Sequence, residues 1–277
     1  MALTEAQLAA MAAELILVPG VTAVVLGGSR ARGTHHPGSD TDLGLYYRRP
    51  LDIDRLSEVA RALAGPSAQV TAPGGWGPWV DGGGWLEVGG DAVDLIYRDL
   101  DRVADVCESV ERGRYAFHTQ AGHPLGFADH AYAGEVALAR VLADPSGEVE
   151  GLRRRLRVYP PALARELVAG LWEADFLVKL ARKGIARGDS AYVSGCLFRL
   201  VGVCAHALHG AAGRWLINEK GAVAAAAALP GAPAEFAERV DKAFAAVDGD
   251  PLRLRLAVDI AADLVLDTAD ACMMMSR

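Results

Sequence analysis

The sequence has little cysteine, and none of it is arranged for metal binding. Only four cysteines occur in 277 residues. They form no CxxC pair, and no cysteine–histidine spacing is typical of a zinc site. We therefore expect buried, reduced thiols in a cytoplasmic protein. The four are Cys107, Cys196, Cys204 and Cys272.

The sequence also lacks an excess of basic residues. The formal net charge is −7, and no strongly basic segment stands out, so the composition does not favour a nucleic-acid partner. A small cationic substrate would be attracted instead.

Long hydrophobic runs are absent as well. Nothing approaches the roughly 18 consecutive apolar residues of a membrane span, and the longest candidate, 221–229, is short and rich in alanine. Glu5 and Glu14 interrupt the N-terminal apolar run, which does not resemble a signal peptide. We expect no membrane partner.

Two common nucleotide-binding motifs are missing. The chain contains no G-x-x-x-x-G-K-[ST] run, and its glycine-bearing loop at 27–38 is not G-x-G-x-x-G. These absences argue against a P-loop and against a Rossmann dinucleotide site.

The patterns that are present divide the chain in two. Short apolar runs in the first half predict strands, whereas periodic alanine- and leucine-rich segments in the second half predict helices. We expect an α+β protein with an N-terminal α/β domain at 1–133, built on a mixed sheet with helices on one face, and an all-helical bundle at 134–277. The expected strands are 21–26, 42–47, 85–88 and 92–97, and the long helices are 162–187, 191–208, 234–247 and 252–272.

A glycine–serine turn follows the first predicted strand. Gly28 and Ser29 begin a polar segment that also carries Arg30 and Arg32. Glycine lets a backbone approach a ligand closely, so main-chain N–H groups and the Ser29 hydroxyl can bind phosphate oxygens. Arg32 is the better of the two arginines for phosphate binding.

Two aspartates stand where the second predicted strand begins. Asp40 and Asp42 are two residues apart, so their side chains share one face of the strand. Carboxylates held this close repel one another unless a cation neutralises them, and an oxygen-only set of ligands suits Mg²⁺. Asp94, flanked by apolar residues in another predicted strand, is the expected third carboxylate. The alternative is that Asp94 is an ordinary strand residue whose side chain faces the solvent.

These residues resemble the DNA polymerase beta-like nucleotidyltransferase superfamily, and within it the small bacterial aminoglycoside-type members. The resemblance rests on Gly28-Ser29, a ten-residue spacer, Asp40-Thr41-Asp42 and Asp94. It covers the α/β half specifically and the helical half only loosely. It implies that Asp40, Asp42 and Asp94 bind two Mg²⁺ ions and that Ser29 binds the triphosphate. The other nucleotide-binding candidates in this half are Gly28, Arg32 and Ser39.

Two aspartates are candidates for the general base. In the superfamily the third metal-binding aspartate, here Asp94, often takes the acceptor's proton. The second candidate is Asp175, which lies four residues before Lys179. This spacing resembles that of kanamycin-type nucleotidyltransferases, which have an acid four residues before a lysine. There the acid is the base and the lysine binds phosphate. An ordinary surface ion pair is the alternative, and Glu166 and Glu173 are competing acids.

Tryptophans are interleaved with glycines between 73 and 90. Trp76, Trp79 and Trp85 could stack on a nucleobase or a sugar ring. Packing within a hairpin is the alternative that we favour.

The sequence thus predicts a Mg²⁺-dependent nucleotidyltransferase of the EC 2.7.7 type. We expect it to transfer a nucleoside monophosphate from a nucleoside triphosphate, ATP first among them, to a hydroxyl of an aminoglycoside-like small molecule. The alternatives are a toxin-like transferase that modifies tRNA or a protein, and a non-catalytic nucleotide-binding module. The sequence leaves the oligomeric state open.

Overall fold

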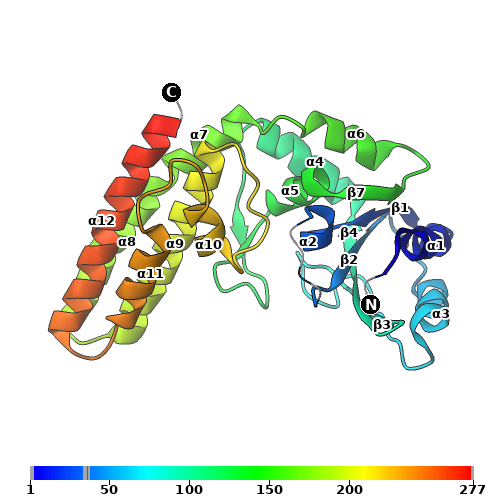
Figure 1. The fold of residues 1–277 in the computed structure, drawn as a ribbon, viewed down its shortest axis with the longest axis horizontal. Coiled ribbons are helices and arrows are strands. Elements are labelled where there is room, and N and C mark those ends of the chain that lie inside the picture. The colour runs from blue at the N-terminus through cyan, green and yellow to red at the C-terminus, as the bar shows by residue number, and fades with distance from the viewer. Residues whose placement is uncertain (1–2, 34–35, 37, 276–277) are drawn as a thin grey trace. The chain divides into compact units, whose positions relative to one another are not determined.

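The computed structural model describes residues 3–33, 36 and 38–275. The chain separates into two compact units (Figure 1). Unit 1 comprises Met1–Ser109 and Ala116–Val158, and unit 2 comprises Val110–Tyr115 and Tyr159–Arg277. The expected α+β class is confirmed, with a mixed sheet in unit 1 and a helical unit 2.

Unit 1 is built on a five-stranded sheet with the strand order β3-β4-β2-β1-β7. β2 and β4 are parallel, and the other neighbouring strands are antiparallel. A separate two-stranded sheet pairs β5 with β6. The strands are β1 (Val21–Leu26), β2 (Thr41–Tyr47), β3 (Gly83–Val88), β4 (Asp91–Asp99), β5 (Phe117–His118), β6 (Phe127–Ala128) and β7 (Arg140–Ala143).

Helices cover both faces of this sheet, whereas the sequence predicted one. Alternate residues of β2 and β4, Leu43, Leu45 and Leu95 among them, pack with α1 and α3 in one apolar core. On the opposite face Arg98 of β4 contacts α5. The helices of unit 1 are α1 (Glu5–Leu15), α2 (Gly28–Ala31), α3 (Ile53–Ala64), α4 (Leu100–Glu111, ending in unit 2), α5 (Ala131–Leu138) and α6 (Glu148–Arg155).

The boundary between the units lies after Val158, later than the expected position after residue 133. The reason is β7, which the sequence analysis missed. This strand pairs with β1 at the edge of the sheet, through Val25 and Val141 for example. The segment from 134 to 158 therefore belongs to unit 1.

Unit 2 has its core around α9, which contacts α7, α8 and α12. By length and composition α9 could span a membrane, but 61% of its most apolar window is buried inside the protein. Gly170 separates α7 from α8, where the sequence predicted one continuous helix. The helices are α7 (Pro161–Ala169), α8 (Leu171–Ile185), α9 (Ser190–Ala211), α10 (Ala222–Ala227), α11 (Phe236–Ala245) and α12 (Pro251–Met275).

The core under β2 is expected to determine the stability of unit 1. Leu45 is fully buried, with 0% of its surface exposed. The change Leu45→Ala should lower the free energy of unfolding by about 2–5 kcal/mol, because it leaves a cavity beneath the central strand. Urea denaturation measures this loss. Leu17→Ala is the matched control, since Leu17 is 69% exposed and its truncation should change stability by less than about 0.5 kcal/mol. Equal effects of the two changes would contradict the assignment of this core.

Candidate active site

Two of the predicted acidic residues lie side by side on one face of the sheet, and the third lies just before it. Asp42 of β2 and Asp94 of β4 are register partners in neighbouring parallel strands. Partners in adjacent strands project from the same face, about 5 Å apart. Asp40 lies two residues before Asp42, and its negative charge acts on both of the other carboxyls. The structure therefore brings the three aspartates into one neighbourhood.

This crowding changes the ionisation of the carboxyls. Burial, together with the negative charges of Asp94 and Asp40, raises the pKa of Asp42 to about 6. Burial and the charge of Asp40 also raise the pKa of Asp94. Each charge makes the next one harder to form, so an added cation would stabilise this arrangement.

The glycine–serine turn lies directly against Asp42. The backbone N–H of Gly27 donates a hydrogen bond to the carbonyl oxygen of Asp42, at 2.8 Å. Gly28 has a positive φ of 61°, and a Cβ added to it would lie 1.7 Å from Oδ2 of Asp42. Only glycine allows this approach. Ser29 follows as the second residue of the short helix α2.

The two arginines of the turn differ in what they do. Arg30 donates hydrogen bonds to the carbonyl oxygens of Ser39 and Asp40, and so holds the loop before β2. Arg32 is exposed, and its positive charge lowers the pKa of Asp42, which places it near that carboxyl. Ser39 uses its hydroxyl oxygen to accept a hydrogen bond from the backbone N–H of His36. Arg32 is thus the arginine whose charge is available beside Asp42.

A fourth carboxylate, which the sequence did not predict, lies close enough to the three aspartates to affect the ionisation of Asp42. The negative charge of Glu135 in α5 also raises the pKa of Asp42. Glu135 forms a two-bond ion pair with Arg98, at 2.6 and 2.7 Å. Arg98 shares a face of β4 with Asp94, four residues away. It also donates to the carbonyl oxygens of Val80 and Tyr97. No local motif signals this pair, because its members lie 37 residues apart.

Asp175 and Lys179 form an ion pair on α8 in unit 2. Both side chains are more than half exposed. The competing acid Glu173 pairs with Arg199 of α9. The role of Asp175 as a base and that of Lys179 as a phosphate ligand remain predictions.

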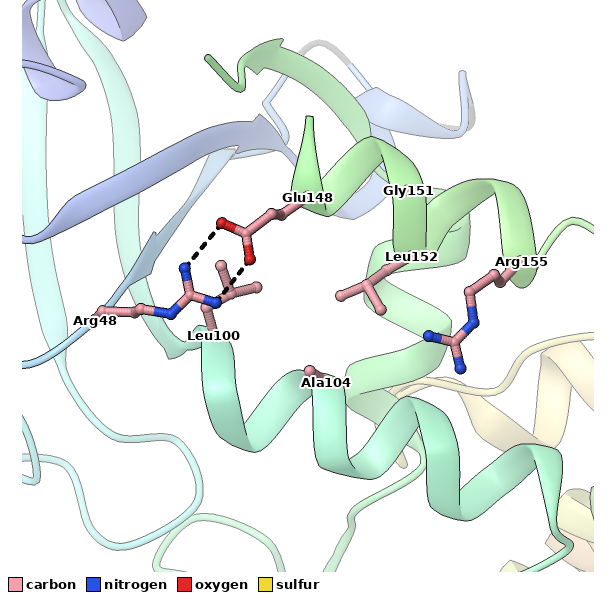
Figure 2. Close-up of a pocket in the computed structure, with 7 residues that line it drawn as sticks. All are labelled: Arg48, Leu100, Ala104, Glu148, Gly151, Leu152 and Arg155. Carbon is pink, nitrogen blue, oxygen red and sulfur yellow. Dashed lines mark hydrogen bonds and ion pairs between the residues drawn. The ribbon is translucent and has the colours of Figure 1, made fainter. Parts of the chain in front are cut away.

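A pocket of about 290 Å³ elsewhere in unit 1 has a different character (Figure 2). There Arg48 forms a two-bond ion pair with Glu148 and a further bond to Asp101. None of the predicted site residues line this pocket, and Arg48 is already neutralised. We therefore place the candidate site at Asp40, Asp42 and Asp94, near the end of the sheet where β2 begins, and we call these three residues the acidic edge. The residues that line the pocket are Arg48, Leu100, Ala104, Glu148, Gly151, Leu152 and Arg155.

The comparison with protein families agrees with this placement. Residues 12–71 match the model of the nucleotidyltransferase domain family. The matched segment contains the glycine–serine turn, Asp40 and Asp42, and it ends before Asp94. The matched segment thus includes β1, α2 and the start of β2, the elements that carry the turn and the acidic pair.

Solved structures can also be aligned with this chain. One of them is a nucleotidyltransferase-like protein from Exiguobacterium sibiricum 255-15, at 11% sequence identity and a TM-score of 0.45. The similarity covers 95% of this chain and 74% of that one. No curated protein matches the sequence.

The Arg98–Glu135 pair is expected to stabilise unit 1. Only 6% of the Arg98 side chain and 26% of the Glu135 side chain are exposed. Glu135→Gln leaves a buried guanidinium without its counter-charge. It should cost about 2–3 kcal/mol, somewhat less than a fully buried pair, because water reaches Glu135.

A double-mutant cycle measured by urea denaturation tests this prediction. The double variant Arg98→Met/Glu135→Gln removes both charges and should be more stable than Glu135→Gln alone. Strictly additive losses would show that the two side chains do not stabilise each other.

Proposed function

We propose that this protein is a nucleotidyltransferase that moves a nucleoside monophosphate from a nucleoside triphosphate, with ATP expected, to a hydroxyl of a small-molecule acceptor. The observation that carries the proposal is the row of Asp42 and Asp94 in register, with Gly28 against the carboxylate of Asp42. The nucleotidyltransferase domain match over residues 12–71 supports it. In the reaction a bond forms between the acceptor oxygen and the α-phosphorus, the α–β phosphate bond breaks, and pyrophosphate leaves.

The donor chemistry of the acidic edge fits Mg²⁺. The carboxyls of Asp40, Asp42 and Asp94 offer only oxygen atoms, which hard cations prefer. The raised pKa of Asp42, about 6, reflects burial and negative neighbours that a cation would compensate. Across residues 3–33, 36 and 38–275, no set of three or more His, Cys, Asp or Glu side chains is already grouped to hold a metal ion. Under the proposal these three aspartates hold the ions once nucleotide is bound.

The other candidate residues have proposed roles in binding the phosphates and in accepting the proton. Bound Mg²⁺ would supply positive charge to the phosphate oxygens, where negative charge builds up during transfer. Gly28 and Ser29 would bind the triphosphate through main-chain N–H groups and the hydroxyl, and the guanidinium of Arg32 would neutralise a phosphate oxygen. Ser39 and Lys179 are the further nucleotide-binding candidates. The acceptor's proton would pass to Asp94 or to Asp175.

The small-molecule acceptor is favoured over tRNA by the charge of the chain. A net charge of −7 attracts a compact cation and repels a polyanion. An aminoglycoside-like acceptor remains the proposed class. A toxin-like transferase would instead be indicated by label transfer to tRNA or protein.

Asp42→Asn tests the metal role of the acidic edge. The change keeps the shape of the side chain but removes one charge. It should lower Mg²⁺-dependent pyrophosphate release from ATP at least ~100-fold, because charge stabilisation of this kind is worth several kcal/mol of barrier. The urea unfolding midpoint should not fall, since a repulsive charge is lost. Near-full activity of the variant would require the proposal to be abandoned.

Gly28→Ala tests the close approach of the turn to Asp42. The new Cβ would collide with Oδ2 of Asp42 and push the carboxylate aside, so pyrophosphate release should fall at least ~10-fold. Gly33→Ala is the matched control. Gly33 has a similar positive φ of 68°, but a Cβ there meets nothing within 4 Å. Both variants place alanine at a similar positive φ, and only Gly28→Ala should lose most of its activity. Equal losses would mean that strain alone explains the effect.

A further inference from the structure

Trp85 extends the row of carboxylates by one strand. It is the register partner of Asp94 across the antiparallel pair β3 and β4. Since Asp94 is also the partner of Asp42, the side chains of Trp85, Asp94 and Asp42 project from one face in a single line. Spacings between strands of about 4.8 Å put the start of the Trp85 side chain roughly 10 Å from that of Asp42.

The indole of Trp85 is backed by a second tryptophan. Trp76 stacks on it with ring centroids 4.6 Å apart and an interplanar angle of 21°. Trp76 lies over Gly83, where an added Cβ would meet its ring at 2.7 Å. Hydrogen bonds hold the backbone of Trp76 to Asp81 and Gln120. Trp85 nevertheless stays 71% exposed. Stacking within the segment, as the sequence analysis favoured, therefore still leaves an open aromatic surface.

The position of this surface in the row indicates which substrate it faces. The phosphate-binding turn lies at the β1 side of Asp42, and Trp85 lies at the opposite, β3 side. In an in-line displacement the acceptor oxygen approaches the phosphorus from the side opposite to the leaving pyrophosphate. If pyrophosphate leaves toward Gly28 and Ser29, the acceptor enters over Asp94 and Trp85.

We propose that Trp85, supported by Trp76, is the stacking surface for the acceptor and selects a hydroxylated ring that carries positive charge. This inference rests on the proposed function. An indole face binds the C–H face of a ring and attracts a cation. The neighbouring Asp94 and Asp42 add negative charge on the side where the reacting hydroxyl must lie. An acyclic cation would gain the charge attraction but little of the stacking.

Equilibrium binding measured by calorimetry tests this assignment without requiring turnover. The cyclic probes are kanamycin A, streptomycin and spectinomycin. Spermidine is the acyclic cation, and ATP with Mg²⁺ is the nucleotide probe. Each is titrated into the full-length protein and into the variants Trp85→Phe and Trp85→Leu. Phe keeps a ring at this position, and Leu keeps apolar area without one.

We expect wild-type protein to bind at least one cyclic probe. Trp85→Leu should raise its Kd at least ~10-fold, and Trp85→Phe no more than ~3-fold. The Kd for ATP with Mg²⁺ should stay within ~2-fold in both variants. Their urea unfolding midpoints should fall only slightly, because the side chain is 71% exposed and the loss is limited to its stacking on Trp76.

Other outcomes would overturn the assignment. A higher Kd for ATP in Trp85→Leu would show that the tryptophan stacks on the nucleobase and not on the acceptor. An unchanged Kd for the cyclic probe, or a loss shared equally by spermidine, would remove stacking from acceptor binding. Wild-type protein that binds ATP but no cyclic probe would reject the ring class. Wild-type protein that does not bind ATP with Mg²⁺ at all would instead count against the proposed function.

Discussion

The repulsion between Asp42 and Asp94 is the constraint around which unit 1 is organised. The parallel pairing of β2 and β4 fixes these residues side by side, and neighbouring like charges are costly without compensation. The raised pKa of Asp42, to which burial contributes most and the charge of Asp94 next, expresses part of that cost. The strands keep this register because their other faces are locked into an apolar core, where a slip of one residue would turn buried leucines outward.

The surroundings of the two aspartates hold the turn close to them. The Gly27 N–H bonds to the backbone of Asp42, and Arg30 bonds to the carbonyl oxygens just before it. Behind them, Arg98 compensates Glu135, which would otherwise add a full further negative charge to this face. The negative charges of the acidic edge therefore outnumber the positive charge of Arg32 on the side of the turn. A triphosphate with its metal ions would bring positive and negative charge together at that place.

The sequence predicted the features that depend on local pattern. The strand at 21–26 was correct, the other three predicted strands differed by one to three residues at their ends, and the acidic pair was placed at the start of β2. The shared face of residues two apart in a strand and the apolar runs both depend only on neighbouring residues. They can therefore be read from a single sequence. The four long helices predicted in unit 2 followed their periodicity for the same reason, apart from the break at Gly170, whereas the short helix α10 was not predicted.

The features that were missed depend on contacts between distant segments. β7 is a four-residue edge strand without alternation, and only its pairing with β1 defines it. The Arg98–Glu135 pair arises from the packing of α5 on β4, and the row from Trp85 to Asp42 arises from the strand order. Composition encodes neither. The glycine-rich connection at 89–91 already indicates a hairpin of β3 and β4, and so a place for Trp85 near Asp94. The alignment of both residues with Asp42 comes only from the parallel pairing of β4 with β2.

The most direct test of nucleotidyl transfer is the fate of a labelled phosphate. ATP labelled at the α-phosphate, and separately at the γ-phosphate, is incubated with the protein, Mg²⁺ and the acceptor panel. Nucleotidyl transfer predicts that the α-label moves to the acceptor and that the γ-label is released as pyrophosphate. Release of the γ-label as inorganic phosphate, or its transfer to the acceptor, would contradict this account.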